Sequence, residues 1–573
     1  MLFSFLRAAP PIVLGYLVLF TTSASAVDQL SFVVNPVALT ATDGRFGPQL
    51  GLGESFTGFN GDPSIGATGE VAYPGDLFPA INGIGEGFWL SRGGQNTAIA
   101  LTNVDGALGP GLGNGIVFDN TFHEALTGAP GDVLFGGFLA GPGIDDSNDL
   151  LYVRHDANGN APLVRTGVAN ALGPGLGESI VFSSFFGAQI NAVNPLFLRA
   201  TIAGLGVTPA TAEGFWRNTP AGNVALARSG LEGPLGPSLG AGVTFDNDGG
   251  STSTFGQYQL VEGSSDVVFV GKTMNSGTSA RNVGIWKNTA AGNTPLALSG
   301  ATGDLGPGLG PNLAFGGLQQ SPLGYMELDV NVQGAMAFFS TLSDGRRGVW
   351  RNLDQQNEPL MLVGASGALG PSVGIQDTFA NFTPSLLLPE PAINDENVVL
   401  FPGLLANSRR QGLWLNYGDG NQVLALTGDD GELGPGLGPG ITFTGFNRAY
   451  FGSSDTVYFT ADLSVNVPFN RNLGLWTYRN GKIQSIAVYD ELFDVDPTTG
   501  TDLRRVEWVQ IPSDFTYDND YGANNSNQLV FRMGFQDGSR GIFLAKPIPE
   551  PGSGAIYVAL ALCAVCLRRR RLW

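Results

Sequence analysis

The sequence is poor in cysteine, in histidine and in positive charge. Both of its cysteines, Cys563 and Cys566, lie near the C-terminal end, and its two histidines, His123 and His155, stand far apart. A disulfide framework, a thiol nucleophile and a histidine-based zinc site or catalytic triad are therefore not expected in the body of the protein. With 29 basic against 49 acidic residues the net charge is −20, so nucleic acid and anionic lipid surfaces are poor partners.

Glycine and hydrophobic residues are, by contrast, abundant. The 573 residues include 85 glycines and 35 prolines, and 43% of the chain is hydrophobic. This composition supplies a sizeable core and many turns, and it stays below the glycine and proline content that indicates disorder. We interpret the glycines as turns between strands.

The N-terminal 26 residues are typical of a secretory signal peptide. One positive charge precedes the apolar run PIVLGYLVLF, and the small residues Ala24 and Ala26 form a cleavage site. We expect an exported protein whose mature chain begins near residue 27.

The C-terminal segment 548–573 has an unusual order of features. Pro549, Glu550 and Pro551 precede an apolar run of 13 residues, which is short for a membrane span of about 20 residues, and an arginine cluster follows at once: Arg568, Arg569, Arg570, Arg571. This order resembles the PEP-CTERM sorting signal of Gram-negative bacteria that make exopolysaccharide. The resemblance implies a transient inner-membrane tether through a short transmembrane helix, processing by an exosortase-type protease, and release to the cell surface or extracellular matrix.

Residues 27–547 contain a long repeat. The phrase Leu-Gly-Pro-Gly-Leu-Gly and its variants start at residues 46, 108, 172, 235, 305, 369 and 433, at spacings close to 64. The phrase lacks the Lys-Ser/Thr of a phosphate-binding loop, and strands rather than a helix are expected after it. It therefore predicts a joint between structural units.

Each unit contains four short runs that indicate strands, such as GVTFDN (242–247), DVVFVGK (266–272), VGIWKN (283–288) and TPLALSG (294–300). Polar turns such as NTAAGN (288–293) join the last two as hairpins, in which we expect Asn and Gly to take positive φ values. The third run carries an aromatic residue that we predict to pack in the core: Trp89, Tyr152, Trp216, Trp286, Trp350, Trp414, Trp476 and Phe543.

Four-stranded units of this length favour an all-β β-propeller over a β-solenoid, whose coils are shorter. The last unit lacks a fourth strand, whereas NPVALTA (35–41) resembles a fourth strand without its first three. Pairing them closes a ring and removes two exposed edges. We therefore predict eight blades closed by the N-terminal strand, with seven blades as the alternative.

Two sets of residues are candidates for binding. Arginines precede the third strand of several units and could form a basic ligand rim, although local carboxylate partners are the simpler interpretation: Arg281, Arg347, Arg410, Arg471 and Arg540. Acidic loops offer weak Ca²⁺ candidates in Asp145, Asp149, Asp518 and Asp520, none with EF-hand spacing. No other cofactor is expected.

The sequence favours a non-catalytic function. We expect a cell-surface or matrix scaffold that binds exopolysaccharide or matrix proteins. The alternative is a carbohydrate-active hydrolase or lyase with paired carboxylates in the propeller channel, but no such pair stands out in the repeat.

Overall fold

The computed structural model describes residues 32–548 except 43, 52, 82–83, 247–252, 276–280, 319–327, 375–376, 381–389, 453–455, 465–472, 497–501 and 513–521. Residues Phe32–Pro547 form one compact unit of strands and short 3-10 helices. Within the part of the chain described, no helix is long and apolar enough to cross a membrane. The predicted signal peptide and the sorting tail from Pro549 onward lie outside the described residues.

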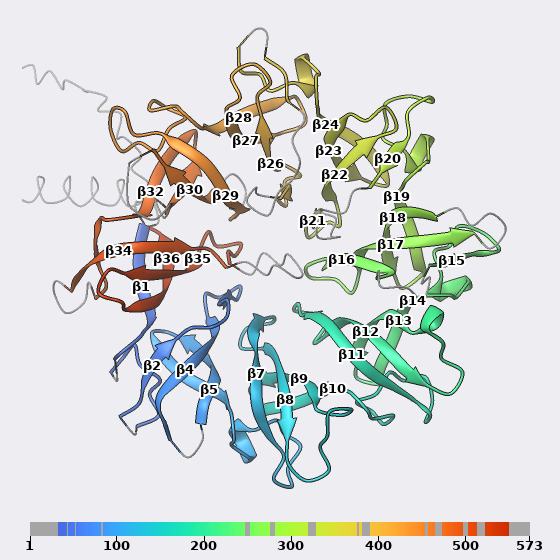
Figure 1. Ribbon diagram of the computed structural model, residues 1–573, viewed down its shortest axis with the longest axis vertical. Coiled ribbons are helices and arrows are strands. Elements are labelled where there is room, and N and C mark those ends of the chain that lie inside the picture. Colours follow the sequence, from blue (N-terminus) through green and yellow to red (C-terminus); the bar gives the residue numbers. More distant parts are fainter. Residues whose placement is uncertain are drawn as a thin grey trace, which may run out of the picture. The chain divides into compact units, whose positions relative to one another are not determined.

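Eight antiparallel sheets follow one another along this unit, and Figure 1 shows them arranged in a ring around a central axis. The predicted eight-bladed β-propeller is therefore confirmed, and the seven-bladed alternative is excluded.

The first four sheets have similar strand orders. The first contains β2 (Ser55–Gly58), β3 (Ser64–Ile65), β4 (Val71–Ile81), β5 (Ile84–Arg92) and β6 (Gln95–Leu101). The second contains β7 (Val117–Thr127), β8 (Val133–Ala140), β9 (Leu150–Asp156) and β10 (Gly159–Arg165). The third contains β11 (Ile180–Gln189), β12 (Phe197–Gly204), β13 (Glu213–Thr219) and β14 (Gly222–Arg228). The fourth contains β15 (Val243–Phe245), β16 (Phe255–Leu260), β17 (Val267–Asn275), β18 (Arg281–Thr289) and β19 (Gly292–Leu298).

The next three sheets continue the pattern. The fifth contains β20 (Phe315–Gly317), β21 (Leu328–Val330), β22 (Met336–Leu342), β23 (Arg347–Leu353) and β24 (Gln356–Leu362). The sixth contains β25 (Ala392–Ile393), β26 (Val399–Leu404), β27 (Gln411–Asn416) and β28 (Asn421–Leu426). The seventh contains β29 (Phe443–Phe451), β30 (Val457–Leu463), β31 (Leu473–Arg479) and β32 (Lys482–Val488). The 3-10 helices are η1 (Gly106–Leu108), η2 (Pro209–Thr211), η3 (Gly233–Leu235), η4 (Gly303–Leu305) and η5 (Gly367–Leu369).

The eighth sheet joins the two ends of the repeat region. It contains β33 (Leu492–Asp494), β34 (Leu503–Gln510), β35 (Leu529–Phe535) and β36 (Arg540–Pro547), with the N-terminal β1 (Phe32–Leu39) on its outer edge. The β1 strand pairs antiparallel with β36, with Asn35 opposite Leu544. The predicted closure by residues 35–41 is therefore confirmed, and it adds no covalent link to the ring.

The recurring aromatic residues lie in the core, as predicted. Each interface between neighbouring sheets holds a cluster of buried hydrophobic residues drawn from both. Trp286 is fully buried and meets Phe245 edge to face, with ring centroids 5.1 Å apart. A glycine two residues before the tryptophan makes room for it, because a Cβ at Gly284 would lie 2.5 Å from the Trp286 ring. Such burial and edge-to-face packing favour one stable arrangement of neighbouring blades.

The glycine-proline phrase lies between the outer strand of one blade and the next blade. The residue after its proline has a positive φ in all seven copies: Gln49, Gly111, Gly175, Ser238, Gly308, Ser372 and Gly436. In five copies the proline carbonyl accepts the indole N–H of the core tryptophan in the following blade, as Pro237 does from Trp286 at 3.0 Å. The phrase is a joint, as predicted, and also a hydrogen-bonding partner of the core.

The hairpin asparagines have a different role from the predicted one. In NTAAGN the glycine, Gly292, takes a positive φ of 105°, whereas Asn293 is 3% exposed and is the second residue of the outer strand. Its Nδ2 donates to the carbonyls of Leu226 and Gly236, at 3.2 and 3.0 Å, which belong to the preceding blade and the phrase. The same contact recurs at Asn96, Asn160, Asn223, Asn357 and Asn421. These asparagines join neighbouring blades instead of shaping turns.

Candidate axial binding site

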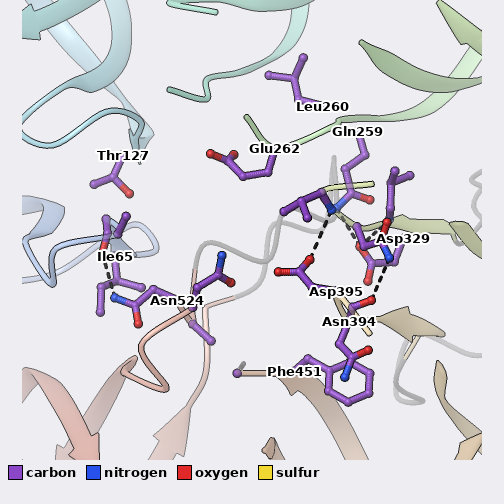
Figure 2. Close-up of a pocket in the computed structure, with 18 of the residues that line it drawn as sticks. Ile65, Thr127, Gln259, Leu260, Glu262, Asp329, Asn394, Asp395, Phe451 and Asn524 are labelled. Atoms are coloured by element: carbon purple, nitrogen blue, oxygen red, sulfur yellow. Dashed lines mark hydrogen bonds between the residues drawn. The ribbon is translucent and has the colours of Figure 1, made fainter. Parts of the chain in front are cut away.

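The inner strands of the blades surround a cavity of about 250 Å³ on the propeller axis. It lies where the first strand of each blade turns back into the second, and all eight blades contribute to its wall (Figure 2). Representative lining residues are Ile65, Thr127, Gln189, Gln259, Asp329, Ile393, Phe451 and Asn524. The wall is therefore a mixture of apolar side chains, amides and carboxylates.

A polar side chain near the end of several inner strands reaches the backbone of the next blade. Gln189 Oε1 accepts the N–H of Leu260 at 2.8 Å. Ser64 donates to the carbonyl of Ala125 at 2.6 Å, and Tyr450 donates to that of Pro512 at 2.8 Å. These bonds satisfy backbone groups that an inner strand edge would otherwise leave unpaired.

Asp329 is the carboxylate member of this set. Its oxygens accept the N–H of Ile393 at 2.7 Å, the side-chain amide of Gln259 at 2.8 Å and its neighbour's N–H. Burial raises the pKa of Asp329, the negative charge of Asp395 adds to the rise, and the hydrogen bonds it accepts oppose it. Because its oxygens join the fourth, fifth and sixth blades, Asp329 is placed as a structural group.

Glu262 and Asp395 are the other carboxylates at the cavity wall. They occupy the second position of equivalent turns in the fourth and sixth blades, and in Figure 2 both point toward the centre of the cavity. Partial desolvation at the cavity wall raises the pKa of Glu262, although its side chain is still exposed to solvent; the charge of Asp395 also raises this pKa, while the backbone N–H groups of Gly263 and Ala192 lower it. These two carboxylates can accept hydrogen bonds from a ligand in the cavity.

Sequence reasoning did not identify these cavity residues. A signal was present, because polar residues such as Gln189 and Asp329 stand near the end of an otherwise apolar inner strand in several repeats. Assigning them to the axis requires the register of the inner strands.

The predicted ligand-rim arginines stand at or just before the third strand of their sheets. Arg281 pairs with Asp246 at 2.7 Å, and Arg410 pairs with Asp429 at 3.2 Å. Arg347 and Arg540 are the first residues of β23 and β36, whereas Arg471 lies outside the described residues. Local carboxylate partners thus engage two of these side chains, and a ligand role for the set stays a prediction.

The predicted calcium ligands are only partly described. Asp145 accepts hydrogen bonds from Ser147, which lower the pKa of this carboxyl, and burial raises the pKa of Asp149 in the same loop. Asp518 and Asp520 lie outside the described residues. In the described ranges, no group of three or more His, Cys, Asp or Glu side chains is arranged to hold a metal ion. His155 contacts Asn160, with Nδ1 and Oδ1 2.8 Å apart.

The fold and its axial cavity define an eight-bladed β-propeller with a cavity of mixed polar and apolar lining on its axis. The chain belongs to a family of unknown function, DUF7453, whose model matches residues 34–231 and 241–555. No curated protein matches the chain.

Several solved propeller structures are similar at low identity. A puromycin-hydrolyzing peptidase of Mycobacterium tuberculosis is 11% identical with a TM-score of 0.33, covering 83% of this chain, which spans only 57% of the peptidase. The β-propeller domain of the Trilobed protease from Pyrococcus furiosus is 9% identical with a TM-score of 0.30, at coverages of 76% and 97%. A lectin of Aleuria aurantia in complex with Fucα1-6GlcNAc is 10% identical with a TM-score of 0.24, at coverages of 64% and 94%. These likenesses carry no argument about activity.

Proposed function

We propose that this chain is an exported, non-catalytic scaffold of the cell surface or extracellular matrix, and that it binds exopolysaccharide. The observation that carries the proposal is the set of hydrogen bonds that Asp329 accepts. Its oxygens are occupied by donors from Ile393, Gln259 and Val330, so this carboxylate holds blades together. The remaining amides and carboxylates at the wall suit hydrogen bonding to sugar hydroxyl groups, as in polar positions of ligand pockets.

Export is the second part of the proposal. The signal peptide with Ala24 and Ala26, and the tail with its Pro-Glu-Pro segment and arginine cluster, support a route through the inner membrane and an exosortase-type protease. Replacing Pro549, Glu550 and Pro551 together with alanine should leave the protein in the membrane fraction. Release of this variant at the normal rate would contradict the sorting assignment.

A second candidate function is a carbohydrate-active hydrolase. Glu262 favours it, because a carboxyl with a raised pKa in a cavity beside a second carboxylate is the arrangement of a general acid. In this case Glu262 would protonate the leaving oxygen and Asp395 would act as the partner carboxylate.

The two candidates are separated by incubating the purified protein with the exopolysaccharide of its own host. The scaffold proposal predicts that the protein sediments with the polymer and leaves its length unchanged. Shortening of the polymer by the native protein, abolished in Glu262→Gln and in Asp395→Asn, would establish the hydrolase instead.

A further inference from the structure

A second cavity lies where the ring closes, between the eighth and first blades. It has a volume of about 410 Å³, and its wall includes Phe59, Trp508, Arg532 and Arg540. This volume falls within the range of about 300–1,000 Å³ that is typical of small-molecule sites. An aromatic ring and two guanidinium groups thus meet in one cavity of ligand size.

Trp508 differs from the core tryptophans in its exposure and in its hydrogen bonding. The six tryptophans on the third strands are fully buried, and five of them donate their indole N–H to a proline carbonyl. Trp508 instead lies on β34, is partly exposed, and has no hydrogen-bond partner among the residues described. Its indole packs over Gly534 on β35, where a larger residue would collide with it. The ring is therefore fixed in place while its N–H remains available.

The two arginines of the cavity are used differently. Arg532, whose side chain is 15% exposed, donates to the carbonyls of Phe59 and Gly61 at 3.1 Å each and pairs with Asp62 at 2.8 Å. These contacts hold Arg532 rigidly across the seam and balance its charge. Arg540 is exposed, and its guanidinium contacts no carboxylate within the described part of the chain. Arg540 therefore supplies a positive charge that is free to meet a ligand.

We propose that this seam cavity binds a sugar ring that carries a carboxylate, such as a hexuronate unit of an acidic polysaccharide. The Trp508 indole would pack against the sugar ring and Arg540 would bind its carboxylate in a bidentate manner, as guanidinium groups do. The inference rests on the proposed function, and it adds the ligand class and a site separate from the axial cavity. The acidic surface opposes a polyanion at long range, but salt screens this repulsion over about 8 Å at physiological ionic strength, so Arg540 acts locally.

The test measures binding of galacturonate and glucuronate di- and trisaccharides, with galactose and glucose oligosaccharides of equal length as neutral probes. Calorimetry and tryptophan fluorescence on the full chain give the affinities. We expect uronates to bind more tightly than neutral sugars, and Trp508→Ala and Arg540→Ala to weaken uronate binding about tenfold or more. Lys482→Ala is the matched control, because Lys482 is an exposed cation at the first position of β32, as Arg540 is of β36.

Two further measurements test the seam cavity. Trp508→Phe should retain most of the affinity, and Arg540→Ala should keep the native circular dichroism spectrum because its side chain is exposed. Equal affinity for neutral and charged probes, no uronate binding by the native chain, or unchanged uronate affinity in Arg540→Ala would overturn the inference. Retention on whole exopolysaccharide is measured separately, so the proposed function can stand when the seam site fails.

Discussion

The interface between the fourth and fifth blades and the seam between the eighth and first blades share the same core hydrogen bonds but differ in how they are packed. At the first, Trp350 meets Phe315 with ring centroids 5.3 Å apart and donates to the carbonyl of Pro307 at 3.0 Å. Asn357 adds bonds to the carbonyls of Leu296 and Gly306. The seam has the matching bonds through Trp89 and Asn96, but it also contains a cavity lined by Trp508, Arg532 and Arg540.

This difference distinguishes residues that stabilise the ring from residues that could bind a ligand. In the repeated interface, the tryptophan and the asparagine use their hydrogen-bonding groups within the protein, which stabilises the ring. At the seam, the eighth blade departs from the repeat and leaves an indole N–H and a guanidinium without partners among the described side chains. The most regular parts of the molecule thus hold the ring, and the irregular part is the better place to look for a ligand.

The largest effect is expected from opening the ring. Ala38→Asp places a charge in a fully buried position of β1, so the free energy of unfolding should fall by about 3–5 kcal/mol. Because no covalent bond holds β1 to β36, limited proteolysis should then release the N-terminal segment first. Ala297→Asp, at the equivalent position of β19, should cost a similar free energy without this selective release. A native melting curve for Ala38→Asp would contradict the closure.

Two tryptophans sharpen the comparison by their different surroundings. Trp350→Ala should lower the free energy of unfolding by about 3–5 kcal/mol, because it removes a fully buried ring and a hydrogen bond. Trp508→Ala should cost less than about 1.5 kcal/mol, because its ring is partly exposed. Denaturation in guanidinium chloride measures both, and equal losses would show that Trp508 is a core residue.

The asparagine contact between blades should have an intermediate effect. Asn293→Ala removes the side-chain donor to the buried carbonyl of Gly236 and one of the two donors to that of Leu226, which keeps its bond from Asn288, so we expect a loss of about 1–3 kcal/mol in thermal unfolding. The control is Lys482→Ala, an exposed residue in the equivalent hairpin of the seventh blade, which should stay within about 0.5 kcal/mol of the native protein. Equal stability of the two variants would show that the asparagine contact does not stabilise the ring.

The smallest change in stability is expected for Glu262→Gln in the axial cavity. The pKa of Glu262 is raised in the folded state, so the unfolded chain loses this proton first and the contribution of Glu262 to stability falls as pH rises from its ordinary value of 4.5 through the folded value. Glu262→Gln should therefore match the native protein below that range and exceed it above, by less than about 1 kcal/mol because the side chain is open to solvent. Parallel stability curves at all pH values would contradict the raised pKa.

Much of the fold could be predicted because it depends on local patterns that recur along the sequence. The period near 64, the third-strand aromatics and the N-terminal strand NPVALTA each repeat a recognisable pattern, and together they predicted eight blades and their closure. Asn293 shows the limit of such reasoning. Asn beside Gly is typical of a turn, and its partner, the carbonyl of Leu226, lies 67 positions earlier.

The candidate sites were harder to predict for a related reason. Glu262, Asp329 and Asp395 come from three blades, and only the register of the inner strands brings them to one cavity. Trp508 lies in VEWVQI (506–511), an apolar run of the last unit that indicates a strand, but the sequence does not show that Gly534 and Arg540 meet it across the sheet. A repeat pattern along the chain therefore does not predict sites that form only when distant strands pair.

A crystal structure of the full chain soaked with a galacturonate disaccharide would test the proposed seam site. We expect electron density in the seam cavity, with a sugar ring against Trp508 and its carboxylate on Arg540. Density in the axial cavity beside Glu262 and Asp395, with an empty seam, would contradict it.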